Sequence, residues 1–275
     1  MKPINLKTIT FAAGLALLAP AAASAQSVWI ERAHEPSVTV EAAKPFFDES
    51  GSTSTSSALA LGLRLPATSK ILVAAELPFA HSGWKEGGVT TRESSIGNPY
   101  LGVEVRPVAQ PLRLDLGVRL PLMPADEFGP AVVGMFSDVE RMDAYMPETW
   151  SVRAGAAYAV PLAPSIGANV RGGPLLTVAK HRVEELDRSE VFATYGGEVF
   201  YQPSRLRLAG GLSGVTHLSE RDTSFDDRSF HQMGLGASYR LNRVRPGVHV
   251  GIPIDRDFRE VMDWSLGLNV QVGLR

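Results

Sequence analysis

Residues 112–122, LRLDLGVRLPL, alternate apolar and polar side chains without a break. Leucine or valine occupies every even-numbered position, and a charged residue, glycine or proline occupies every odd-numbered one. Because successive side chains of a strand point to opposite faces, this pattern predicts a β-strand with one apolar and one polar face. In a soluble sandwich the leucines would face a core; in an outer-membrane barrel they would face lipid, and the arginines a lumen.

The same alternation recurs along the chain and predicts twelve strands. An even number is typical of bacterial single-chain barrels with both termini on one side. The expected strands cover residues 37–44, 59–65, 71–79, 101–105, 112–122, 150–160, 166–178, 191–201, 206–212, 233–241, 248–254 and 264–274.

The connections between these strands are alternately short and long. The longer ones are residues 46–56, 80–95, 123–149, 179–190, 218–229 and 255–261. Short periplasmic turns and longer extracellular loops are characteristic of outer-membrane barrels. The sequence therefore predicts an all-β fold, a 12-stranded antiparallel transmembrane β-barrel, with its leucines facing lipid.

Residues near the expected strand ends support a membrane position. Aromatic residues on the apolar face fall at the two ends of the strands, as expected for belts at the two membrane interfaces. They are Tyr158, Tyr201 and Tyr239 near short turns, and Phe79, Trp150 and Trp264 near long loops.

The first 25 residues have the features of a secretory signal peptide. Lys2 and Lys7 supply positive charge, residues 11–20 are apolar, and Ala23-Ser24-Ala25 forms a small-residue cleavage site. We therefore expect residues 1–25 to be removed and residues 26–275 to form one domain in the bacterial outer membrane. The net charge of −2 gives no basis for nucleic-acid binding, and the absence of cysteine excludes disulfides and thiolate chemistry.

Strand parity directs eight arginines and four acids into the barrel. Seven charged residues are the expected pore lining, and the excess of arginine favours anions. The alternative is a ladder of ion pairs that fills the barrel and conducts nothing, because a barrel of this size can be open or filled. Neither a cofactor nor a metal ion is expected. The expected pore-lining residues are Glu76, Glu104, Asp115, Arg119, Arg153, Arg171 and Glu198; the other inward arginines are Arg64, Arg106, Arg113, Arg207 and Arg240.

Residues 123–149 form the longest expected loop, and their segment 130–136, PAVVGMF, is too apolar for a freely solvated loop. The loop either folds into the barrel mouth, as a constriction or an apolar binding site, or packs on itself across the rim. Its acidic residues either hold a divalent cation together with lipid phosphates or are simply solvated. These acids are Asp126, Glu127, Asp138, Glu140 and Asp143.

Residues 97–106, GNPYLGVEVR, resemble the Gly-Asp-x-x-Leu-Gly-x-Lys-Tyr-Arg pattern of the outer-membrane proteins named for the meta-pathway of phenol degradation. Residues 73–79 and 114–122 are similar to that family's flanking strands. The chain departs from the pattern at Asn98, where the family has aspartate, and at Leu274-Arg275, where barrels commonly end in an aromatic residue. The resemblance implies a channel or transporter for small solutes, with hydrophobic or aromatic compounds as candidates.

The sequence contains no nucleophile elbow, zinc-protease motif, phosphate loop or dinucleotide fingerprint, so we expect no enzyme and no catalytic residue. Two alternatives to a channel remain. One is a closed structural or adhesive barrel that acts through its loops; the other is an outer-membrane lipid hydrolase, in which His181 or His231 would be essential. The expected partners are outer-membrane lipids and lipopolysaccharide, the small-molecule solute, and the barrel-assembly machinery.

Overall fold

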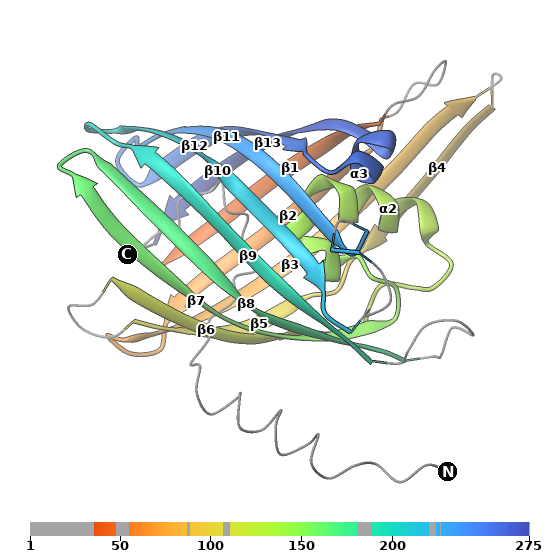
Figure 1. Ribbon diagram of the computed structural model, residues 1–275, viewed down its shortest axis with the longest axis horizontal. Coiled ribbons are helices and arrows are strands. Elements are labelled where there is room, and N and C mark those ends of the chain that lie inside the picture. The colour runs from red at the N-terminus through yellow and green to blue at the C-terminus, as the bar shows by residue number, and fades with distance from the viewer. Residues whose placement is uncertain are drawn as a thin grey trace, which may run out of the picture.

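The computed structural model describes residues 36–47, 55–86, 89–106, 111–180, 189–219, 224–225 and 227–274. Twelve strands form a closed antiparallel barrel, and each strand expected from the sequence is confirmed (Figure 1). The expected signal peptide lies outside the described residues. The barrel strands are β1 (Ser37–Phe47), β2 (Ser57–Pro66), β3 (Ile71–Glu86), β5 (Tyr100–Val105), β6 (Leu112–Arg119), β7 (Thr149–Ala163), β8 (Ile166–Ala179), β9 (Ser189–Tyr201), β10 (Leu206–His217), β11 (Ser229–Tyr239), β12 (Val244–Pro253) and β13 (Met262–Gly273).

The first and last strands close the barrel. β1 pairs with β13 from Ser37↔Gly273 onward, and its other edge pairs with β2. Every strand of the barrel therefore has a partner on both edges, which satisfies the backbone amide and carbonyl groups without water.

The outer face of the barrel is apolar, which answers the question raised by residues 112–122. In β6, Leu116 is 53% exposed, whereas its neighbour Asp115 is 7% exposed. Tyr158 and Tyr201 are exposed near the short turns, and Trp264 stacks on Phe46 near the long loops, with ring centroids 3.9 Å apart. The leucines therefore face outward and the charged side chains inward, with aromatic residues at both ends of the wall.

One additional strand was missed by the sequence analysis. β4 (Val89–Ile96) pairs with the last residues of β3, and the resulting hairpin projects beyond the long-loop rim (Figure 1). The sequence predicted a loop over residues 80–95 because the segment lacks apolar alternation. Almost all of β4 is exposed, so neither of its faces requires apolar residues.

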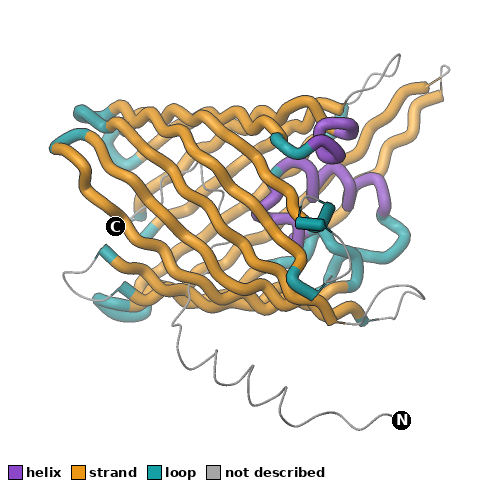
Figure 2. Tube along the Cα trace, viewed as in Figure 1, coloured by secondary structure: helices purple, strands orange, loops and turns teal. Residues whose placement is uncertain are grey.

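Helical segments occupy the long-loop end of the barrel (Figure 2). The helix α2 (Phe128–Ser137) and the 3-10 helix η1 (Val139–Ala144) belong to the loop of residues 123–149, and α3 (Arg256–Val261) precedes β13. The ends of the long loop meet, since the Glu148 amide donates to the Met123 carbonyl at 2.9 Å. None of the helices in the described ranges has both the length and the apolar character needed to cross a bilayer.

Replacing Leu116 with arginine tests the outward orientation of β6. We expect Leu116→Arg to lower the free energy of unfolding in lipid vesicles by about 2 to 4 kcal/mol, the cost of a cation on the lipid face near the bilayer midplane. The control is Leu122→Arg, beyond the end of β6, where the cost falls to about 0 to 1 kcal/mol. Equal costs at both positions, measured by denaturant unfolding, would contradict this orientation.

Candidate functional site

The seven charged residues predicted from the sequence all point into the barrel. Six are buried, and the Arg171 side chain is 13% exposed. Neighbouring strands align several of them: Glu104 lies opposite Asp115, and Arg119 lies opposite Tyr100. Arg240, also expected to point inward, is instead exposed because it follows the end of β11.

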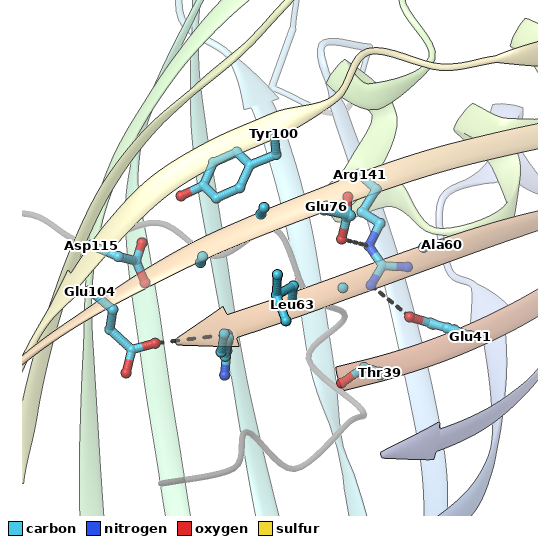
Figure 3. A pocket seen from close by; sticks show the side chains of 13 residues that line it. Thr39, Glu41, Ala60, Leu63, Glu76, Tyr100, Glu104, Asp115 and Arg141 are labelled. Atoms are coloured by element: carbon cyan, nitrogen blue, oxygen red, sulfur yellow. Dashed lines mark ion pairs between the residues drawn. The ribbon is translucent and has the colours of Figure 1, made fainter. Parts of the chain in front are cut away.

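The long loop enters the barrel and carries η1 between opposite walls. Arg141 of η1 forms ion pairs with Glu41 of β1 at 2.6 Å and with Glu76 of β3 at 3.3 Å (Figure 3). Of the two arrangements that the sequence left open, the structure therefore has the loop folded into the barrel. Packing across the rim alone would not bring Arg141 to the wall.

On the opposite side, the acids of η1 pair with arginines of β6, β7 and β8. Asp143 lies 3.2 Å from Arg119 and 3.4 Å from Arg153, and Glu140 forms an ion pair with Arg171. The Ser151 hydroxyl also donates to Asp143 at 2.7 Å. We call this set the η1 bridge: Glu41, Glu76, Arg119, Glu140, Arg141, Asp143, Arg153 and Arg171.

Opposite charges favour the ionised forms of Asp143 and Arg141 despite their burial. Burial by itself would raise the pKa of Asp143, but Arg153, Arg119 and the Ser151 hydroxyl outweigh it and hold the pKa below its ordinary value. Burial would likewise lower the pKa of Arg141, yet Glu41 and Glu76 raise it above the usual range. Each buried charge thus has an opposite charge within ion-pairing distance, which offsets the cost of removing it from water.

The segment that carried the family resemblance anchors the bridge. Asn98 donates through its amide to the carbonyls of Asp143 and Met146, at 3.2 and 2.7 Å, and accepts from the Met123 amide at 3.0 Å. Its own amide donates to the Ala144 carbonyl at 2.6 Å. A Cβ at Gly97 would lie only 2.4 Å from that carbonyl, so glycine is required for this close approach. Asn98 therefore holds both the start and the end of the loop.

Tyr100 of β5 lies next to Arg119, a member of the η1 bridge on β6. Glycines on β5 and β6 make room for its ring, because a Cβ on Gly102 or Gly117 would lie 2.3 Å from atoms of the Tyr100 side chain. The Arg119 guanidinium sits over the ring at 5.5 Å from its centroid, a distance compatible with a cation–π contact.

A small cavity of about 40 Å³, lined by apolar and charged side chains, lies beside the bridge (Figure 3). Glu104 on its wall pairs with Arg106 at 2.5 Å and with Arg64 at 3.8 Å. A space of this size accommodates a few water molecules at about 10 to 15 Å³ each. Further round the barrel, Glu198 pairs with Arg207 at 2.7 Å and accepts from Asn169 at 2.7 Å.

The long-loop side of the bridge is apolar. Val139 packs in a buried cluster with wall residues and with Phe258 of α3, and Phe136 joins this cluster. A row of aromatic side chains continues from it: Phe258, Phe136, Phe47 and Trp84 follow one another with ring centroids 5.2, 6.1 and 5.3 Å apart. We call the row of Phe258, Phe136, Phe47 and Trp84 the aromatic mouth. It lies on the long-loop side of the charged η1 bridge.

The sequence analysis found the wall arginines but not their partners Glu140 and Asp143. It also missed the pairing of Arg141 with Glu41 and Glu76. It treated Glu140 and Asp143 as solvated or cation-binding, whereas both are buried, and no group of side chains in the described residues could hold a metal ion. A signal was available: inward arginines outnumbered inward acids, so acids had to come from another segment.

Comparison with known proteins supports the fold. No protein-family model matches the chain, and no curated protein matches its sequence, so the resemblance to the phenol-degradation family is not confirmed. Solved barrels do match in structure. The NanC porin has a TM-score of 0.52 at 9% identity, covering 86% of this chain and 100% of the porin. The translocator domain of the autotransporter NalP from Neisseria meningitidis has a TM-score of 0.51 at 14% identity, covering 90% of this chain and 91% of that domain.

This chain has the fold of bacterial outer-membrane barrels. Its closed wall, apolar outside and charged inside, is the arrangement required of a barrel that spans a membrane. The chain is therefore placed in the bacterial outer membrane.

Removing the Asp143 charge should destabilise the protein. Asp143→Asn removes a buried carboxylate that forms ion pairs with both Arg119 and Arg153, and we expect a loss on the order of 3 kcal/mol in the free energy of unfolding. The control is Asp126→Asn in the same loop, because Asp126 is exposed and its change should be within about 0.5 kcal/mol. Equal effects in denaturant unfolding would contradict the bridge.

The difference in unfolding free energy between the wild type and Asp143→Asn should depend on pH. The folded state lowers the pKa of Asp143 from 3.8, so its stabilising contribution is complete above that value and is lost as the pH falls through the lower folded-state value. The stability difference between wild type and Asp143→Asn should therefore narrow as the pH is lowered below 3.8. A constant difference down to pH ~2 would contradict ionisation of Asp143 in the bridge.

Proposed function

We propose that the protein is an outer-membrane channel or transporter for small solutes, and that the η1 bridge closes its lumen. The observation that supports this proposal is the loop inside the barrel, held by ion pairs to both walls. The hydrogen bond between Glu148 and Met123 brings the two ends of the loop together, so the segment could move as a unit while the barrel stays intact. Exchange of these ion pairs for water is the step that would open a path.

The aromatic mouth supports a solute with an apolar or aromatic body. Phe47, Phe136 and Trp84 are half-buried, so their rings are accessible at the long-loop end. Aromatic faces bind apolar solutes and other rings through dispersion and offset stacking. Beyond the mouth lie the charged side chains of the bridge, which favour a solute that also carries a polar group.

Ion selectivity should depend on the position of the loop. Arg119, Arg153 and Arg171 face the acids Asp143 and Glu140 while the bridge is formed, so the anion preference expected from the wall arginines is offset. Without the loop, these arginines would face the lumen with fewer counter-charges. Charged side chains that line a narrow passage then determine which ions pass.

Shortening the loop tests the channel and its closure. Replacing residues 124–147 with two glycines should give single-channel currents in planar bilayers larger than those of the wild type. Under a salt gradient, the reversal potential of this variant should indicate anion preference. The control is deletion of residues 86–89, which shortens the β3–β4 hairpin beyond the rim and should leave the wild-type current unchanged.

Two results would contradict the proposal. If folded wild-type and loop-shortened proteins both carry no current, the barrel is a closed structural or adhesive scaffold. If both carry the same current, the loop does not control the lumen. Heat-dependent gel mobility confirms that each protein is folded before the recording.

A further inference from the structure

The outer wall carries a continuous chain of polar side chains that the channel does not use. The His231 Nε2 lies 2.5 Å from the Tyr195 hydroxyl, and its Nδ1 lies 2.7 Å from an Asp255 carboxylate oxygen. The chain continues from Tyr195 to the Thr216 hydroxyl at 3.1 Å, and from Thr216 to the Ser229 hydroxyl at 2.9 Å. Three neighbouring strands, β9, β10 and β11, contribute these groups, and Asp255 precedes α3.

Strand register places this cluster on the membrane side of the wall, not in the lumen. His231 is two residues from Met233 on β11, so both side chains point to the same face. Met233 is exposed and aligned with exposed Leu212 and Ile252 on the adjacent strands. The cluster therefore lies directly above an apolar row, toward the long-loop rim.

This height corresponds to the outer-leaflet interface, where the polar and ester groups of lipids meet the hydrocarbon core. The His231 and Asp255 side chains are each 18% exposed, and the Tyr195 side chain is half-buried. A titratable pair at the edge of an apolar membrane face loses hydration, and ionisable residues kept at such a cost commonly mark functional sites.

The available donors and acceptors determine the direction of each hydrogen bond in this cluster. A carboxylate only accepts, so the proton of neutral His231 lies on Nδ1, toward Asp255, and Nε2 accepts from Tyr195. Because the Tyr195 hydroxyl donates its proton to His231, it accepts from the Thr216 hydroxyl. The Thr216 hydroxyl in turn accepts from the Ser229 hydroxyl. Every hydroxyl in the chain therefore donates toward the imidazole, the arrangement of a base oriented by a carboxylate beside a hydroxyl nucleophile.

Local packing fixes this geometry. Gly214 lies between Tyr195 and His231 in the strand register, and a Cβ there would come within 2.7 Å of both rings. Asp255 is held by a second contact, because the His231 backbone amide donates to its other carboxylate oxygen. The base and the phenol thus meet only because the residue between them has no side chain.

We propose that Tyr195, His231 and Asp255 form an esterase site for acyl esters of outer-leaflet lipids. His231 Nε2 takes the phenol proton as Tyr195 Oη bonds to the ester carbonyl carbon. The bond between that carbon and the lipid alcohol oxygen breaks, and the alcohol leaves with the proton from His231. Water, deprotonated by His231, then hydrolyses the acyl-tyrosine, releasing fatty acid and restoring the phenol.

The full-length folded barrel in detergent micelles, with p-nitrophenyl palmitate as probe, tests this site. We expect a burst of one p-nitrophenol per chain, followed by slower turnover, because an acyl-tyrosine forms and then hydrolyses. Tyr195→Phe keeps the ring and should abolish the burst, with at least a ~100-fold loss of rate. His231→Gln should produce a similar loss.

Tyr201→Phe is the matched control, because it removes an exposed phenol hydroxyl from the same strand, β9, at its short-turn end and outside the cluster. This variant should keep the burst and a rate within about fivefold of the wild type. The second probe is a vesicle of dipalmitoyl phosphatidylcholine containing the barrel, with released palmitate measured by mass spectrometry. Absence of a burst and of palmitate release in the wild type, full activity in Tyr195→Phe, or an equal loss of activity in Tyr201→Phe would each overturn the proposal.

Discussion

Closure of the sheet by hydrogen bonds between β1 and β13 is the constraint on which the rest of the structure depends. Inside a bilayer no water is available to the backbone, so an open edge would leave a row of amides and carbonyls unpaired. Once the sheet closes, strand alternation has only one consistent outcome: leucine and valine face outward, and the charged side chains face a common interior. Both sites described above follow from this division of the wall.

The positive charges inside the barrel are not balanced by the acidic residues of the strands alone. Arg119 and Arg153 are buried, and the wall supplies too few acids for all the inward arginines. The long loop supplies the missing charges through Glu140 and Asp143, and its own Arg141 pairs with the acids of β1 and β3. Because ion pairs bridge opposite walls, the contacts that stabilise the loop are the same ones that we propose close the lumen.

The sequence predicted the parts of the fold that follow from a local period. All twelve barrel strands and the inward orientation of Glu76, Glu104 and Asp115 come from alternation alone. The η1 bridge was not predicted, because its partners are distant in sequence and η1 lacks a strand pattern. The family-like segment at Asn98 was recognised by its residues, but its role in holding the loop became visible only through its contacts.

The outer-wall cluster was hidden for a different reason. The sequence offered His231 as a candidate only in the hydrolase alternative, and Tyr195 fits the apolar outward pattern, so nothing linked the two residues. Their contact depends on strand register and on Gly214, which places the rings side by side across three strands. A period of two identifies which face a residue occupies, but it does not identify its neighbours across the sheet.

The most direct test of the barrel account is accessibility of spin labels along β6 in lipid vesicles. The chain contains no cysteine, so single cysteines can be introduced from position 112 to position 119 and labelled one at a time. The account predicts an alternation with a period of two, in which labels at 114, 116 and 118 collide with lipid-soluble oxygen and those at 113, 115 and 117 do not. Uniform accessibility, or the opposite phase, would contradict a barrel with its leucines in the membrane.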